Sequence, residues 1–262
     1  MKKKTALENI LKDTTSGSTD LLLKLNEIVK ANLDNKSDLK LLLKNAKQKF
    51  QSFEVIQNYL RQIDLYNKRN SDKSLKRFID GFRLIQDKSF EAIYENALPY
   101  LRKVRTILTL SNSKTILGTL ILLGKQNTRL RIIIAESRPK LEGRILARNL
   151  LKNKIQVELI TDAMLPQFIS KADAVIIGAD KILSNGNIIN KAGSLSAAIL
   201  CHYYNKPFYV LASKDKLSKR EKHIHEEYKP AEVWNYNSSY LKVANIYFEE
   251  VNNKLITKII TN

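Results

Sequence analysis

Along the first hundred residues, apolar side chains recur every three to four positions, which is the spacing of one face of an α-helix. Three such sets stand out: Leu21, Leu22, Leu25, Ile28 and Val29; Val55, Ile56, Tyr59, Leu60 and Ile63; and Phe78, Ile79, Phe82 and Ile85. Polar stretches at residues 14–18, 34–37 and 67–72 interrupt the pattern, because short polar side chains compete for helix hydrogen bonds. Residues 1–103 are therefore predicted to form a helical N-terminal domain.

From residue 104 the pattern changes to short β-branched runs that alternate with helical segments. The runs predicted as strands are residues 106–110, 131–135, 157–161, 174–178 and 208–212. Residues 141–152 and 192–204 are long enough for crossover helices. Such alternation favours a mostly parallel sheet with right-handed crossovers. Residues 104–262 are thus predicted to form a Rossmann-like α/β domain, with the boundary near the end of a helix over residues 90–102.

Composition adds limits to this picture. The chain has 262 residues, of which 44% are hydrophobic, so it can fill a core. No stretch approaches the roughly 18 consecutive apolar residues of a membrane span. The basic start, MKKKTALENILKD, lacks the apolar segment of a secretory signal. We therefore expect a cytoplasmic protein without a membrane partner.

The chain has few cysteine and histidine side chains, with one cysteine and three histidines. A single cysteine, Cys201, excludes an intrachain disulfide and a thiolate-rich zinc site, and its apolar helical surroundings predict a buried filler. His223 and His225 precede two glutamates and are the best metal candidates, but without further ligands a solvated loop is expected. The sequence thus predicts no metal and no cofactor. Trp234 is expected to pack as a core or interface aromatic.

The formal net charge of +19 would attract phosphates, nucleic acids or acidic protein surfaces. The positive side chains are mostly lysines spread along the whole chain, and no arginine-rich base-reading element is present. Solvated helix faces account for this pattern better than a dedicated nucleic-acid surface.

Polar side chains follow each of the five predicted strands. The first strand is followed by Ser111, Ser113 and Lys114, the second by Arg138, the third by Asp162, the fourth by Asp180 and the fifth by Lys216. Each has an ordinary explanation as a loop residue or helix cap. Because ligands of parallel sheets bind beyond the carboxyl ends of the strands, their convergence indicates a site for a phosphorylated, hydroxyl-rich ligand.

The segment GADKILSNGNIINKAG, residues 178–193, carries the most specific signal. Small residues bring the backbone close to Asp180, and Asn185-Gly186 predicts a tight turn. The turn returns the chain to Asn190 and Lys191 at the expected start of a helix, so an acid, an amide and an ammonium share one pocket. Asp180 can then exchange a proton while Lys191 supplies positive charge. The alternative is a hairpin-like excursion held by an Asp-Lys pair.

These residues resemble a known family. GADKILSNGNIINKAGS followed by KPFYVLASKDKL is similar to the initiation factor 2B α/β/δ regulatory subunits and to the related ribose-1,5-bisphosphate and methylthioribose-1-phosphate isomerases. The resemblance extends to ESRPKLEG, ITDA, EEYKPAEVW and FEEVNNKLITKIIT, and more weakly to DTTSGSTD at residues 13–20. It implies a dimer or a larger ring-like assembly.

In the isomerase branches, the resemblance implies an acid-base pair formed by a cysteine after the first strand and the aspartate of the GAD segment. The aspartate carries over as Asp180, but Ser111 occupies the cysteine position, and a serine hydroxyl without an activating base is a weak nucleophile. The implied ligand contacts that carry over are Asn190, Lys191, Lys216, Ser113 and Lys114. Two arginines that the resemblance implies are absent from this sequence. Residues 16–18 read Ser-Gly-Ser where the phosphate-binding arginine is expected, and the position of the second arginine falls near Gln51.

Three hypotheses follow for the function. The leading one is a non-catalytic initiation factor 2B-like protein that binds a phosphorylated sugar or nucleotide and acts through contacts with copies of itself or related subunits. The second is an aldose-ketose isomerase acting on a sugar 1-phosphate such as ribose 1,5-bisphosphate, with Lys114 or Lys191 assisting Asp180. The third is a basic RNA-binding module, which only the net charge favours.

Overall fold

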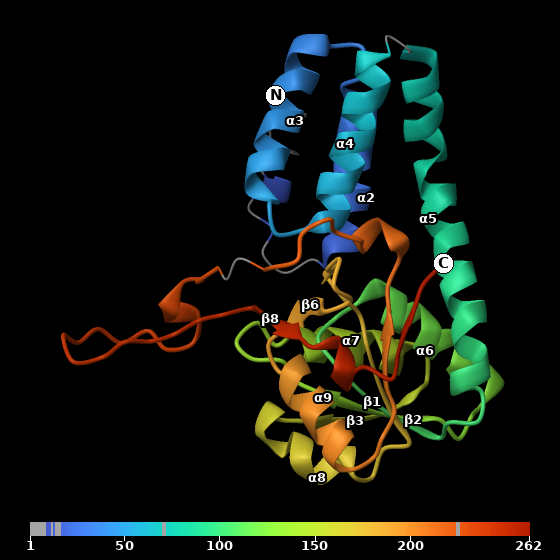
Figure 1. Ribbon diagram of the computed structural model, residues 1–262, viewed down its shortest axis with the longest axis vertical. Helices are drawn as coiled ribbons and strands as arrows, with labels where there is room; N and C mark the ends of the chain where they lie inside the picture. The colour runs from blue at the N-terminus through green and yellow to red at the C-terminus, as the bar shows by residue number, and fades with distance from the viewer. Residues whose placement is uncertain (1–8, 12, 14–16, 70–71, 224–225) are drawn as a thin grey trace.

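The structure is a computed structural model that describes residues 9–11, 13, 17–69, 72–223 and 226–262. A group of long helices stands on a three-layer α/β domain (Figure 1). Both halves of the predicted architecture are thus confirmed. Most of the predicted break at residues 14–18 and part of that at 67–72 lie outside the described residues.

The helical region consists of α2 (Ser18–Ala31), α3 (Lys36–Lys49), α4 (Glu54–Lys68) and the upper half of α5 (Asp72–Leu101). The apolar sets read from the sequence form one core here, with Leu25, Ile56 and Ile79 almost fully buried. Ile85 is the exception, because its side chain is exposed. The break before α3 is fixed by Asn35, whose side chain accepts a hydrogen bond from the Asp38 amide at 3.2 Å.

Helix α5 differs from the expectation of a separate boundary helix, because it runs unbroken for 30 residues through both regions. Its first half places Leu75 and Phe82 in the helical core, whereas its second half places Ile93 and Leu101 in the core of the α/β domain. The two regions therefore share a helix, which ends at Leu101, two residues before the predicted boundary at residue 103.

The main sheet has six strands in the order β3-β2-β1-β4-β7-β9, and every neighbouring pair is parallel. The strands are β1 (Thr106–Leu110), β2 (Arg131–Ala135), β3 (Gln156–Ile160), β4 (Ala174–Ile177), β7 (Phe208–Leu211) and β9 (Lys258–Ile260). The five strands read from the sequence are confirmed to within one residue at each end. In β1, β2, β4 and β7 the agreement comes from buried apolar runs, because a covered parallel strand has two apolar faces, whereas the edge strand β3 is largely exposed.

Helices cover both faces of this sheet. One face carries α5, α6 (Lys114–Gln126) and α7 (Glu142–Lys152), and the other carries α8 (Leu165–Ile169) and α9 (Ser194–Tyr203). Cys201 of α9 is buried as expected, and burial raises the pKa of its thiol to about 12. Short 3-10 turns occupy η1 (Asp162–Met164), η2 (Lys214–Lys216), η3 (Pro230–Glu232) and η4 (Asn253–Leu255).

A second, antiparallel sheet of three strands begins shortly after β4, with the strand order β5-β6-β8. Its strands are β5 (Lys181–Ile182), β6 (Ile188–Lys191) and β8 (Phe248–Val251). The tight turn expected at Asn185-Gly186 lies between β5 and β6, and Gly186 has a φ of +83° that side chains other than glycine rarely adopt. The sequence did not reveal β8 as the partner of β6, because that pairing is long-range.

Residues 233–244, here called the arm, extend away from the body of the molecule (Figure 1). The arm has a turn at its tip, where the amide of Leu241 donates to the carbonyl of Ser238 at 3.2 Å. Within the described part of the chain, no helix combines the length and the apolar character that a membrane crossing requires.

The start of α7 depends on a glycine. A Cβ atom on Gly143 would overlap the carbonyl oxygen of Ala135 and lie 3.0 Å from the Cα of Glu136, both backbone atoms at the end of β2. We expect Gly143→Ala to lower the free energy of unfolding by ~3 kcal/mol, measured by urea titration. Gly81→Ala in α5 is the matched control, since nothing lies within 4 Å of its Cβ position. That change should stabilise the helix by about 0.5–1 kcal/mol, and equal losses in both variants would contradict the steric explanation.

Candidate functional site

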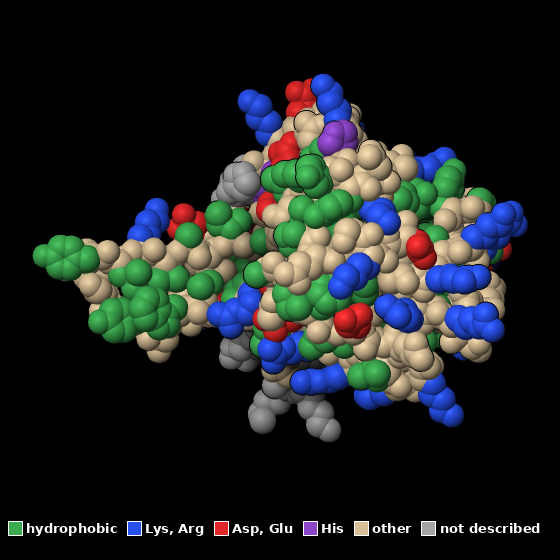
Figure 2. All heavy atoms as spheres, turned by 90° about the horizontal axis from the view of Figure 1, so that it is seen from below, with side chains coloured by type: hydrophobic (Ala, Val, Ile, Leu, Met, Phe, Trp, Pro, Cys, Tyr) green, Lys and Arg blue, Asp and Glu red, His purple; other side chains and the backbone are tan. Residues whose placement is uncertain are grey.

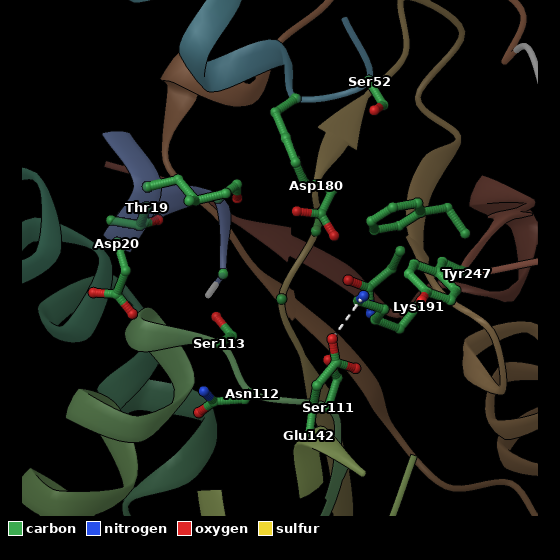
Figure 3. Close-up of a pocket in the computed structure, with 18 of the residues that line it drawn as sticks. Thr19, Asp20, Ser52, Ser111, Asn112, Ser113, Glu142, Asp180, Lys191 and Tyr247 are labelled. Carbon is green, nitrogen blue, oxygen red and sulfur yellow. Dashed lines mark ion pairs between the residues drawn. The ribbon is translucent and has the colours of Figure 1, made fainter. Parts of the chain in front are cut away.

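A cavity of about 200 Å³ lies between the helical region and the carboxyl ends of β1 and β4 (Figure 3). These two strands are neighbours at the point where the strand order reverses, which is where open parallel sheets bind ligands. The helical region closes the cavity from the other side with the start of α2 and residues 49–53, which precede α4. The site is therefore built jointly by both regions.

The structure brings together most of the residues selected from the sequence. The cavity is lined by Ser111, Ser113, Lys114, Asp180, Asn190, Lys191 and Lys216. Arg138 is the exception: it is exposed, does not line the cavity, and its guanidinium donates to the carbonyl of Val233 at 3.1 Å. Asp162 is also outside and accepts the amides of Ser137 and Arg138 at 2.9 and 2.8 Å. Its role is to hold the loop after β2.

The loop after β1 is held in an uncommon conformation. Ser111 is buried with a φ of +64°, and its amide donates to the Ser137 hydroxyl at 2.7 Å. Ser113 then caps α6, and it lies so close to Gly178 that a Cβ there would be 2.8 Å from the Ser113 Oγ. The loop therefore presents a serine and the amide end of a 13-residue helix to the cavity, an arrangement that favours anions.

Asp180 and Lys216 meet where β4 ends. The amide of Asp180 donates to the carbonyl of Ile189 at 2.8 Å, which fixes it in the β5–β6 hairpin. The Lys216 ammonium is buried and donates to the carbonyl of Ala179, the residue before Asp180. Burial lowers the pKa of Lys216, and the negative charges of Asp180 and Asp215 oppose that shift. A desolvated ammonium thus lines the same cavity as the Asp180 carboxylate and is influenced by its negative charge.

Lys191 has different partners from those expected. It lies at the end of β6 rather than at the start of a helix, and its ammonium pairs with Glu142 at 2.8 Å instead of with Asp180 (Figure 3). The ammonium also lies 4.9 and 4.6 Å from the ring centres of Tyr247 and Phe248. Asn190 is buried and donates to the Ser194 hydroxyl at 2.9 Å. The Ser194 hydroxyl therefore fixes the orientation of the Asn190 amide.

An aromatic wall lines one side of the cavity, formed by Phe53, Tyr228, Tyr247 and Phe248. The rings of Tyr228 and Tyr247 stack at 3.7 Å with an interplanar angle of 6°, and Phe53 meets Phe248 edge to face at 5.9 Å. Sequence reasoning missed this wall, because its members come from distant segments without a shared periodicity. A run of aromatics near residues 228–248 was the only available signal.

Helix α4 holds the parts of the site that carry Lys216 and Asp180. Asn58 donates to the carbonyls of Asp215 and Leu217 at 2.5 and 3.2 Å, on either side of Lys216. Glu54, at the start of α4, pairs with Arg61 at 2.7 Å and with the buried Lys181 at 3.8 Å. Burial lowers the pKa of Lys181, while the charge of Glu54 raises it. These contacts between the two regions were also missed.

The cavity does not share the strongly positive charge of the whole chain. Among the described residues that line it, five carry carboxylates, namely Asp13, Asp20, Glu142, Asp180 and Glu226, and four are lysines, namely Lys49, Lys114, Lys191 and Lys216. No thiol, imidazole or guanidinium belongs to this described set. Lys114 pairs with Asp20 at 3.4 Å. The lining therefore offers near-balanced charge to a ligand.

Metal coordination finds no support in the residues that the structure describes. None of their histidine, cysteine, aspartate and glutamate side chains gather in a group of three or more that could hold an ion. His225, one of the two candidate histidines, lies outside the described residues, as does Ser16 of the Ser-Gly-Ser sequence.

The Glu54–Lys181 pair gives a test of how the two regions are joined. Glu54→Gln leaves the buried Lys181 ammonium without its carboxylate, so we expect a loss of ~3 kcal/mol in the free energy of unfolding at neutral pH. Between the lowered folded-state pKa of Lys181 and its ordinary value of 10.5, the unfolded chain binds more protons, so stability rises with pH. The deficit of the variant should therefore shrink as pH approaches 10.5.

Urea titrations at neutral and alkaline pH measure this dependence. Glu91→Gln, an exposed position on α5, is the control and should change stability by less than ~0.5 kcal/mol at both pH values. A deficit for Glu54→Gln that stays constant with pH would show that Lys181 does not carry the penalty.

Known proteins share this fold and sequence pattern. The chain is 36% identical over 191 residues to methylthioribose-1-phosphate isomerase of Thermotoga petrophila, covering 65% of this chain and 56% of the relative. It is 37% identical over 120 residues to translation initiation factor eIF2B subunit alpha of Dictyostelium discoideum, covering 46% and 37%. The chain thus spans little more than half of the first relative and less of the second.

The crystal structure of Pyrococcus horikoshii translation initiation factor eIF-2B shows the same fold, with a TM-score of 0.85 at 24% identity over 99% of this chain and 94% of that one. The sequence profile described as the Initiation factor 2 subunit family matches residues 4–262. That match takes in the helical region, the β1 loop and the GAD segment alike. The chain therefore belongs to the Initiation factor 2 subunit family.

Proposed function

We propose that this protein binds a phosphorylated sugar or nucleotide in the cavity and acts through contacts with other protein subunits, without full isomerase activity. The observation that carries the proposal is that Ser111, after β1, and Asp180, after the adjacent strand β4, both line the cavity. A buried serine cannot take the acid-base role that the family resemblance assigns to a cysteine, because no described histidine lines the cavity to activate it. In this proposal the cavity still binds the ligand, but Asp180 lacks a partner that could complete the proton transfer.

The lining suggests how such a ligand lies. The phosphate would lie at the start of α6, where Ser113, Lys114 and the amide end of the helix favour an anion. Ribose hydroxyls fit beside Asp180 and Asn190, and the aromatic wall accepts an apolar or aromatic substituent. Four lysines against five carboxylates favour one phosphate over two, because a second phosphate would add charge that the lining does not neutralise.

A second candidate is an aldose-ketose isomerase acting on a sugar 1-phosphate such as ribose 1,5-bisphosphate. Lys114 and Lys191 are poorly suited to assist Asp180, since they pair with Asp20 and Glu142. The observation that favours the isomerase is Lys216, which lines the cavity together with Asp180 and whose pKa is lowered by burial. In that reaction Asp180 and Lys216 would move a proton between C2 and C1 of the opened sugar.

Partners and location follow from the same proposal. The relatives are named as isomerases or as initiation factor subunits, so we propose association with further copies or with related subunits in the cytoplasm. A role in translation initiation would be exercised through those contacts. RNA binding is disfavoured as the main role, because the lysines are dispersed and the cavity is close to neutral.

Ligand binding is tested by thermal unfolding with AMP, ribose 5-phosphate and ribose 1,5-bisphosphate. We expect the melting temperature to rise with a monophosphate, corresponding to about 2.7 kcal/mol when the ligand is at 100 times its dissociation constant. Asp180→Asn and Lys216→Met should remove the rise. Arg138→Ala should leave it intact, because Arg138 lies outside the cavity.

Turnover is measured on the same samples by following ketose formation with NMR. We expect none from ribose 1,5-bisphosphate. Ketose formation that Asp180→Asn abolishes would replace the binding proposal with the isomerase. No thermal shift with any of the three compounds would contradict a sugar-phosphate or nucleotide pocket.

A further inference from the structure

The surface of the molecule does not decide how many phosphates the cavity accepts. Figure 2 shows Lys and Arg side chains spread over one face of the molecule, with Asp and Glu side chains between some of them. Salt screens such exposed charges over distances beyond about 8 Å. The arm adds one charged residue, Lys242, and its Trp234 is 57% exposed, so Trp234 does not pack in the core, one of the two places expected for it. The choice of ligand therefore depends on the groups that line the cavity.

Two ion pairs lie at different ends of the cavity and differ in burial. At one end Lys114 lies 3.4 Å from Asp20, and the two side chains are 48% and 42% exposed. At the other end Lys191 lies 2.8 Å from Glu142, and these side chains are only 18% and 9% exposed. In Figure 3, Asp20 and Ser113 lie on the left, and Lys191 with Glu142 lies on the right. One end of the cavity thus has an exposed ion pair and the other a buried one.

The exposed pair can exchange its partner for a phosphate. Water screens the attraction between half-exposed charges, so the pair of Lys114 with Asp20 contributes little to stability. The Lys114 ammonium can therefore turn to a phosphate at the start of α6, where the amide end of the helix also favours an anion. This is the end of the cavity at which the proposed function places the phosphate.

The buried pair is held in place from several sides. Glu142 is the first residue of α7, where the helix dipole favours a carboxylate. Lys191 ends β6, which pairs with β8, and its ammonium lies 4.9 and 4.6 Å from the ring centres of Tyr247 and Phe248. Separating Lys191 from Glu142 would leave a buried charge without its partner. A ligand must therefore fit the pair as it stands.

A hydroxyl fits this pair, whereas a phosphate does not. A hydroxyl can accept a hydrogen bond from the Lys191 ammonium and donate its own proton to the Glu142 carboxylate. A phosphate ester carries a charge of about −1.5 to −2 at neutral pH, and its oxygens are acceptors. The Glu142 carboxylate would repel such a group at the distance of contact, which offsets the attraction of Lys191. Lys191 is thus neutralised in advance toward a second phosphate.

We propose that Glu142 makes the cavity selective for a sugar monophosphate over a sugar bisphosphate, and that the pair of Glu142 and Lys191 binds the hydroxyl at the far end of the sugar. In ribose 5-phosphate this is the hydroxyl on C1. The inference rests on the proposed function, because it takes the phosphate to lie at the start of α6, and it adds the class of ligand. The charge of Glu142, rather than its size, sets the preference.

Calorimetric titration of the full chain at neutral pH measures the dissociation constants of ribose 5-phosphate and ribose 1,5-bisphosphate. We expect the unaltered protein to bind the monophosphate at least about 10-fold more tightly. Glu142→Gln keeps the size of the side chain and an acceptor oxygen but removes the charge. The ratio of the two dissociation constants should therefore shift at least about 30-fold toward the bisphosphate.

Glu136→Gln is the matched control. Glu136 pairs with Arg144 of α7 at 2.6 Å and does not line the cavity, so its substitution removes the same charge close to the site but outside it. We expect this variant to keep the ratio of the unaltered protein. Circular dichroism checks that both variants are folded.

A measurement on the unaltered protein needs no variant, so it applies even where Glu142→Gln does not fold. The probe is 1,4-anhydroribitol 5-phosphate, which keeps the ring and the phosphate of ribose 5-phosphate but lacks the hydroxyl on C1. We expect it to bind at least about 5-fold more weakly, because the ion pair then has no hydroxyl to bind. The loss is limited because Lys191 and Glu142 still satisfy each other.

The outcomes separate this inference from the proposed function. A bisphosphate that binds the unaltered protein as tightly as ribose 5-phosphate would overturn the role of Glu142 and keep the pocket. So would a ratio that Glu142→Gln leaves unchanged or that Glu136→Gln shifts equally, and so would equal binding of the anhydro compound. If none of the three compounds bound the protein, the cavity would be rejected as a sugar-phosphate site, and the inference would fall with it.

Discussion

The cost of removing ammonium groups from water governs the seam between the two regions. Lys181 and Lys216 are buried there, and such groups are tolerated only when anions or carbonyl dipoles replace the lost water. The partners come from both sides, since Glu54 belongs to α4 and the carbonyl of Ala179 follows β4. The seam is thus specific, and the cavity that it encloses keeps its shape only while helical region and sheet stay together.

How much of this could be predicted depended on the distance along the chain between interacting groups. The five strands and the helical faces were correct, because burial leaves a local apolar pattern. Asp180, Asn190 and Lys191 were grouped correctly because one short hairpin carries them. The partner of Lys191 was wrong, since Glu142 lies on another loop and nothing near it in sequence reveals the pairing. For the same reason, distance along the chain, the sequence did not predict the role of Glu54, the aromatic wall or the continuity of α5.

Charge shows a second limit of sequence reasoning. A net charge of +19 describes the whole surface, whereas the cavity gathers slightly more carboxylates than ammonium groups among its described residues. Family membership leaves the chemistry equally open, because relatives named as isomerases and as initiation factor subunits share the fold. The features of this chain that bear on its chemistry are local: a serine after β1, a Lys191 ammonium paired with Glu142, and a buried Lys216 that lines the cavity together with Asp180.

Helix α5 gives the molecule a mechanical property. Because one continuous helix belongs to both cores, tilting the helical region over the cavity must also displace its lower half. That half meets the far edge of the main sheet, where Asn96 donates to the carbonyl of Thr261 at 2.8 Å and Lys258 donates to the Tyr100 hydroxyl at 2.6 Å. Closure over a bound molecule would therefore be transmitted as strain to β9, at a distance from the cavity and without any ligand contact there.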